Sequence, residues 1–220
     1  NVPPRTGIHR RGATASRVSE RAHDVWLPPQ RIVHRDLKAE NVLVGSDGHV
    51  KLCDFGASRQ FQDNFGNPLV SIEIGTPPYM APELFPVGLT DEDYWANDGK
   101  AYGRIDARKV DVFAFGSTMW ALLCGRQPFH HLETRAEIQA AVQTRGERPL
   151  IPEGWPAALK ALVLCCWQQT PEHRPDFPEI VRALELFVST RLRLSVGAST
   201  SDPFREFQLL LTTGVRARHH

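Results

Sequence analysis

Two short stretches of this 220-residue sequence carry side chains that could move a phosphoryl group. Residues 34–41 read HRDLKAEN, and residues 54–56 read DFG. Phosphoryl transfer needs a carboxylate that orients and deprotonates a hydroxyl, and oxygen ligands that hold Mg²⁺ on the phosphates. Asp36 suits the first task. Asn41 and Asp54 suit the second, because a hard cation prefers carboxylate and amide oxygens.

A turn signal between these stretches explains how they could meet. Gly45-Ser46-Asp47-Gly48 separates two β-type runs, residues 42–44 and 49–52, which predicts a hairpin that returns Asp54 to the neighbourhood of Asn41. Lys38, two residues after Asp36, could neutralise charge that develops on the transferred phosphate. Each residue alone could equally be a solvated polar group near a turn. Their order and spacing together favour catalysis.

The elements that must position these residues are mostly helical. Apolar periodicity predicts helices over residues 110–123, 134–143, 156–167 and 178–188, the first closed by Gly125. The helix 110–123 is apolar on nearly every face, as expected at the centre of a bundle. Apolar spacing also predicts a helix over residues 15–26, and a short β-type run predicts a strand at residues 32–33. Residues 54–86 lack periodicity and contain much Gly and Pro, which predicts a long functional loop. The predicted fold class is mostly α, a helical bundle around a buried central helix with a small β-hairpin at the catalytic cleft.

Composition excludes several other classes of protein. The formal net charge is +1, with 41% hydrophobic and 23% charged residues, which is typical of a globular protein and gives no reason to expect nucleic acid or a membrane as partner. The longest apolar stretch, residues 110–124, falls short of the roughly 20 residues that span a bilayer. The cysteines lie in apolar segments without CxxC spacing, which favours reduced thiols and a cytoplasmic location over disulfides or zinc.

The two stretches, followed by Ala-Pro-Glu at residues 81–83, resemble the catalytic-domain signatures of protein kinases. Lys38 and the run Gly-Thr-Pro-Pro-Tyr at residues 75–79 look like serine/threonine kinases. Residues 166–180 are similar to the closing segment of tyrosine kinases and tyrosine-kinase-like kinases. Together these features point to the tyrosine-kinase-like group of serine/threonine kinases. The resemblance implies transfer of the terminal phosphoryl group of ATP, with Mg²⁺, to Ser or Thr hydroxyls of a protein substrate.

The resemblance also assigns roles to individual residues. It implies catalytic roles for Asp36, Lys38, Asn41 and Asp54. It implies cofactor binding by Lys38, Asn41, Leu43 and Asp54, with Asn41 and Asp54 as metal ligands. Residues expected to support the substrate loop and the structure are Arg35, Phe55, Gly56, Thr76, Glu83, Asp111 and Arg174.

Some of these support roles predict specific contacts. Thr76 would contact Asp36 and Lys38 from the peptide-binding loop. Asp111, near the start of the central helix, would anchor the backbone of the catalytic loop, residues 34–41. The alternative for Asp111 is a carboxylate that only interacts with the helix dipole.

Arg174 would pair with Glu83 and fix the far end of the activation segment. The alternative is two unrelated surface charges. Arg35, next to the catalytic aspartate, would sense a phosphorylated activation loop, because a guanidinium binds phosphate. Ser71 and Ser58 are the candidate phosphorylation sites, and an unmodified loop serine is the alternative for both.

The domain prediction follows the extent of the resemblance. Residues 14–190 match the larger, C-terminal lobe of a kinase domain, residues 1–13 are expected to be a disordered lead-in, and residues 191–220 a tail. The family's Gly-rich loop, strand lysine and partner glutamate should precede the catalytic loop, but residues 1–33 contain no lysine, so the small lobe is expected to be absent. The alternative functions are a non-catalytic, kinase-like binding or regulatory module and a truncated product.

Overall fold

The structure, a computed structural model, describes residues 32–60, 74–85 and 105–195. All of them belong to the compact unit formed by residues 31–220. The predicted lead-in and the predicted helix 15–26 lie outside the described residues, as do Ser71, the segment 86–104 and everything after residue 195.

The central helix α2 spans Ala107–Cys124 and is buried along most of its length. Its N-terminus is capped by Asp106, whose side chain accepts a hydrogen bond from the backbone N–H of Arg108. Gly125 ends it with a φ of 65°, a left-handed conformation that glycine adopts at little cost. The predicted helix 110–123 is therefore confirmed, although it begins three residues earlier, at the cap, because Ala107 and Lys109 are also buried.

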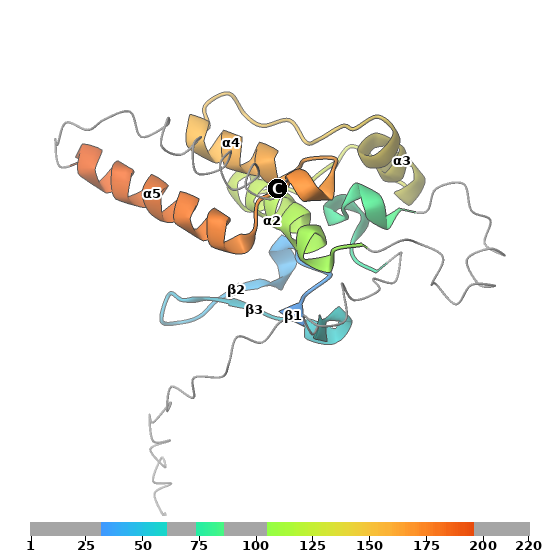
Figure 1. Cartoon of the computed structure of the whole chain (residues 1–220), viewed down its shortest axis with the longest axis horizontal. Helices are drawn as coiled ribbons and strands as arrows, with labels where there is room; N and C mark the ends of the chain where they lie inside the picture. Colours follow the sequence, from blue (N-terminus) through green and yellow to red (C-terminus); the bar gives the residue numbers. More distant parts are fainter. Residues whose placement is uncertain (1–31, 61–73, 86–104, 196–220) are drawn as a thin grey trace, which may run out of the picture. The chain divides into compact units, whose positions relative to one another are not determined.

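Helices α4, Ala157–Cys166, and α5, Phe177–Ser195, pack against α2 (Figure 1). Their shared core consists of Val112, Leu162, Cys166, Ile180 and Ala183. The approach of α4 to α2 depends on Gly116, because a Cβ at this position would lie 2.8 Å from the Cβ of Cys166. The Trp167 indole then donates a hydrogen bond to the hydroxyl of Ser117 at 3.0 Å.

The predicted helix 134–143 is correct in position but not uniform. The α-helix α3 spans only Arg135–Gln139 and begins with a reciprocal capping box between Thr134 and Glu137. The chain then continues as η6, Ala140–Thr144, with wider π-type hydrogen bonding. Ala141 and Val142 of η6 are fully buried in the main core, so packing holds this wider turn.

Two small antiparallel strand pairs flank the segments that contain the predicted site residues Asp36, Asn41 and Asp54. Strand β2, Val42–Val44, pairs with β3, Val50–Leu52, in the register Val42↔Leu52, as the hairpin prediction required. Strand β1, Ile32–Val33, pairs with β4, Arg59–Gln60, a partner that the sequence did not indicate. The remaining short helices are η1 (Ala39–Asn41), η2 (Phe55–Ala57), η4 (Pro77–Tyr79), η5 (Pro82–Leu84) and η7 (Pro171–His173).

The predicted secondary-structure content is confirmed in the described residues. They form helices packed around α2, together with the small β-hairpin β2–β3. None of the helices in this part of the chain is long and apolar enough to cross a membrane.

Candidate active site

Asp36 lies in the loop between β1 and η1 and is bound from two sides. Its Oδ2 accepts a hydrogen bond from Lys38 Nζ at 2.9 Å. Its Oδ1 accepts one from the Thr76 hydroxyl at 2.8 Å. Lys38 also donates to the Thr76 oxygen at 2.9 Å, so the three side chains form a closed triangle. The contacts that the sequence predicted for Thr76 are present.

This triangle controls the charge of the Asp36 carboxyl. Burial alone would raise its pKa, but hydrogen bonds from Lys38 and Thr76 and the charge of Lys38 together hold the pKa below its usual value. Asp36 is therefore ionised at neutral pH. A carboxylate has about four acceptor positions, so the two bonds leave room for a further hydroxyl donor.

The backbone of the same loop is held by Asp111 of α2. The carboxylate accepts hydrogen bonds from the backbone N–H groups of His34 at 2.6 Å and Arg35 at 2.8 Å. Asp111 lies beyond the first turn of α2, so the anchor prediction is confirmed and the dipole alternative is wrong. Burial raises the pKa of Asp111, and the two N–H donors oppose that rise only in part. The anchored Arg35 has a φ of 67°, a strained value for a non-glycine residue.

Asn41 and Asp54 are brought close together by the hairpin, because the backbone N–H of Cys53 donates to the carbonyl of Asn41 at 3.0 Å. Asn41 is buried, and its amide nitrogen donates to the backbone oxygen of Asp36 at 2.9 Å. Its amide oxygen makes no hydrogen bond within the described residues and is free to act as a ligand. Asp54 is exposed and has a left-handed backbone, with a φ of 60°.

The chemistry of this oxygen pair fits Mg²⁺. One amide oxygen and one carboxylate, completed by phosphate oxygens and water, are the ligands that this ion commonly takes. Among residues 32–60, 74–85 and 105–195, no group of three or more His, Cys, Asp or Glu side chains could hold a metal ion.

Leu43 lies on the hairpin face opposite to Val42 and Leu52, because side chains alternate along a strand. It is 51% exposed, so this apolar side chain is open to a ligand. Val42 and Leu52 instead line an apolar cavity of about 480 Å³ against α2 and α5.

Phe55 and Gly56 follow Asp54 in helix η2. The Phe55 ring is half exposed and lies 4.9 Å from the His34 ring, between centroids. A side chain at Gly56 would meet the Oδ1 atom of Asp54 at 3.4 Å, so glycine leaves this oxygen uncovered. His34 itself is buried and bonds to the carbonyl of Cys53 at 3.0 Å. It ties the catalytic loop to the hairpin, a role that its position in the motif did not reveal.

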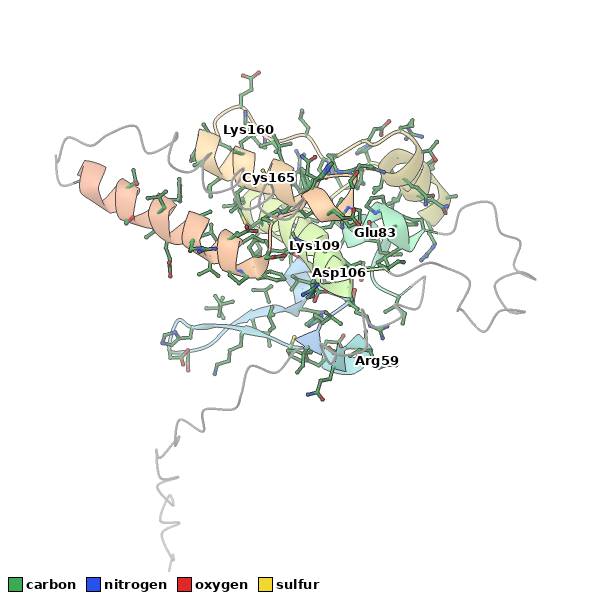
Figure 2. All side chains as sticks on the ribbon, in the orientation of Figure 1. Arg59, Glu83, Asp106, Lys109, Lys160 and Cys165 are labelled. Atoms are coloured by element: carbon green, nitrogen blue, oxygen red, sulfur yellow. The ribbon has the colours of Figure 1, made fainter. Side chains whose placement is uncertain are left out.

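Arg35 and Arg59 form a pair of like charges beside this loop, and Arg59 is labelled in Figure 2. The buried Arg35 donates through Nε to the carbonyl of Ala57 at 2.6 Å. Burial, followed by the charge of Arg59, lowers the pKa of Arg35. The hydroxyl of Ser58, one of the candidate phosphorylation sites, donates a long hydrogen bond of 3.5 Å to the carbonyl of His34.

The predicted pair of Glu83 and Arg174 is bidentate. Arg174 Nη1 and Nη2 donate to the two Glu83 oxygens at 2.6 and 2.8 Å. Arg174 is fully buried, so the alternative of unrelated surface charges is wrong. It also donates to the backbone oxygen of Lys109, and Figure 2 labels Glu83 and Lys109. Lys109 is buried too and bonds to Asp176 at 2.6 Å, a link that no sequence signal indicated.

The helical body, the loop anchored by Asp111 and the buried Glu83–Arg174 pair define a protein of the kinase class. Comparison with known families supports this assignment. The model of the family described as protein tyrosine and serine/threonine kinase matches residues 22–184. This chain therefore belongs to the protein kinase family.

Relatives with curated names agree with the family. A protein named as a probable serine/threonine-protein kinase of Dictyostelium discoideum is 37% identical over 159 residues, covering 72% of this chain and 15% of that protein. The dual specificity protein kinase shkB of the same organism is 36% identical, over 70% of this chain and 21% of its own length. The serine/threonine/tyrosine-protein kinase HT1 of Arabidopsis thaliana is 34% identical, over 74% of this chain and 36% of its own. The chain thus spans well under half of each.

Proposed function

We propose that this chain is the larger lobe, residues 14–190, of a serine/threonine protein kinase of the tyrosine-kinase-like group. It transfers the terminal phosphoryl group of ATP to a Ser or Thr hydroxyl of a protein substrate. The observation that carries the proposal is the triangle of Asp36, Lys38 and Thr76, because it places an ionised carboxylate beside a fixed cation.

In this mechanism Asp36 is the catalytic base. The substrate hydroxyl donates its proton to the carboxylate as its oxygen attacks the terminal phosphorus, and the bond between that phosphorus and the ADP oxygen breaks. Lys38 stabilises the negative charge on the transferred group, since its ammonium is held 2.9 Å from Asp36. Thr76 keeps both side chains in place and positions the substrate loop.

The nucleotide would be held by the hairpin and its neighbours. Asn41 and Asp54 would supply oxygen ligands to Mg²⁺, which neutralises phosphate charge when bound. Leu43 would contact the nucleotide through its exposed side chain. Arg35, with Arg59 nearby, would bind a phosphate on the activation loop, because an anion relieves the repulsion between two guanidinium groups. The four cysteines are all free, which supports the proposed cytoplasmic location.

A phosphotransfer assay tests the catalytic roles. Labelled ATP, Mg²⁺ and a general protein acceptor are supplied to the chain and to a version extended at its N-terminus with a lysine-bearing small lobe from a relative. We expect the extended protein to phosphorylate the acceptor and its Asp36→Ala variant to lose at least about 100-fold of that rate, with unchanged thermal unfolding. A variant that kept its turnover would contradict the assignment of the base.

The second candidate is a non-catalytic binding module. In this candidate the kinase-type lobe serves as a docking or regulatory surface. Thermal unfolding of the chain with ATP and Mg²⁺ separates the two candidates. A rise in Tm that requires both ligands and is lost in Asp54→Ala supports the nucleotide site. No rise in the extended protein would favour the module.

A further inference from the structure

A second hollow lies at the surface between the end of η6 and the loop that follows α4. It is a shallow, open groove with a volume of about 530 Å³, lined by residues of the segments 143–148 and 164–169. None of the catalytic-loop residues contributes to it. Arg145 and Arg148 are the charged residues among its described lining. No Asp or Glu belongs to that lining.

Arg148 is a cation whose hydrogen-bond partners are all neutral. It donates to the backbone oxygens of Trp167, Val142 and Glu147 at 2.9, 3.2 and 2.8 Å, and to the side-chain oxygen of Gln169 at 2.6 Å. Its guanidinium carbon lies 4.9 Å from the centroid of the Phe113 ring. These contacts orient the guanidinium but leave its charge without a bonded anion among the residues that the structure describes.

The surroundings make that charge costly. Burial, followed by the charge of Arg174, lowers the pKa of Arg148 to about 10, and the charge of Glu83 opposes this only in part. A partly buried cation without a bonded counter-ion is unfavourable, and a carboxylate brought to it would be stabilised. The groove therefore favours an anionic occupant.

The rest of the groove suits a peptide. Arg145 stands exposed on its edge, paired only with the exposed Glu147, and such surface pairs exchange partners at little cost. Gln168 and Gln169 are exposed. Their amide nitrogens already donate to the carbonyls of Leu164 and Gln143, and each keeps a second N–H that can donate to a peptide backbone. Leu164 is 46% exposed and offers an apolar contact.

We propose that the groove between residues 143–148 and 164–169 binds an acidic segment of a partner protein. Carboxylates of that segment approach Arg148 and Arg145, its backbone bonds to the glutamine amides, and an apolar side chain contacts Leu164. The groove does not overlap the catalytic triangle, so this inference stands independently of the proposed kinase activity.

Fluorescence anisotropy with a synthetic peptide tests the inference. The probe is a short fluorescein-labelled peptide of glutamates with one central leucine, and its control replaces each glutamate by glutamine. The whole chain should bind the acidic probe saturably, and the glutamine peptide at least about tenfold more weakly. Arg145→Gln should weaken binding about three- to fivefold, since an exposed ion pair contributes little. Leu164→Glu should weaken it about tenfold, by placing a like charge in the groove.

The matched control is Arg182→Gln, which removes the same charge from an exposed position on α5 outside the groove. It should leave binding unchanged. Equal binding by all variants, equal binding of both peptides, or saturable binding of inorganic phosphate alone would overturn the proposal. Hydrogen exchange of the unmodified chain locates the probe without any substitution. Protection of residues 143–148 and 164–169 supports the groove, and protection confined to other segments rejects it.

Discussion

Replacement of Arg174 by alanine measures how much the buried pair with Glu83 contributes to the fold. The substitution removes two charge-assisted hydrogen bonds to the carboxylate. It also removes the donors to the backbone oxygens of Lys109, Gln168 and Gln169. The Glu83 side chain is only 16% exposed, so it cannot fully recover these bonds from water. Loss of one partner of a buried pair costs about 3–5 kcal/mol.

Equilibrium urea unfolding followed by tryptophan fluorescence gives the measurement, because Trp120 and Trp167 are both buried in the native state. We expect a lower midpoint at an unchanged slope, which would indicate a loss of stability without a change in the unfolded state. A loss of 3–5 kcal/mol is a large share of the about 5–15 kcal/mol that stabilises a typical domain.

Two further variants make the result interpretable. Glu83→Gln keeps one acceptor oxygen and should cost less than Arg174→Ala, so it remains measurable if the alanine variant does not fold. In the double variant the two losses should not add, because both remove the same interaction. Arg182→Ala, at an exposed position, should change stability by less than about 0.5 kcal/mol. A loss below about 1 kcal/mol in Arg174→Ala, or additive losses, would refute the reasoning.

Two other predictions concern packing and charge. Gly116→Ala should lower the free energy of unfolding by about 1–2 kcal/mol, because the new Cβ would lie 2.8 Å from the Cβ of Cys166. This loss should outweigh the better helix propensity of alanine. A higher Tm in thermal unfolding would contradict the close approach of α4. Lys38→Met should raise the pKa of Asp36, measured by carboxyl NMR titration, because Lys38 supplies both a hydrogen bond and a charge that lower it. Because the pKa of Asp36 is lower in the folded state than its ordinary value of 3.8, the ionised carboxylate stabilises the fold above pH 3.8, and this stability is lost as the pH falls through the folded pKa. The variant should therefore lose less stability over this pH range. An unchanged titration of Asp36 would contradict its contact with Lys38.

The sequence predicted the elements with strong periodicity or clear turn signals. Helix α2 and the β2–β3 hairpin were found because an apolar run and a Gly-rich turn are local signals. The pairing of β1 with β4 was missed, because two-residue strands carry no periodicity and their partners are distant in the chain. The wider turns of η6 were missed because they are held by tertiary packing rather than by local propensity.

In the candidate site, too, contacts with a recognisable sequence signal could be predicted and contacts that depend on tertiary packing could not. The contacts of Thr76, Asp111 and Arg174 could be predicted from the order of motifs that resemble one family. The burial of Lys109 could not be predicted, because a lysine side chain is normally exposed to solvent. Its ammonium group is instead bound by Asp176 and the carbonyl of Arg174, which are distant in the sequence. The metal and nucleotide roles of the hairpin residues remain predictions.

The anchoring of the catalytic loop by Asp111 separates the shape of that loop from its chemistry. Two adjacent backbone donors require two acceptor atoms at one point, which aspartate supplies and asparagine does not. Asp36 takes no part in that attachment. A descendant of this chain could therefore lose the Asp36 carboxylate by a single nucleotide change and still inherit an intact loop, which selection could reuse as a surface for recognition.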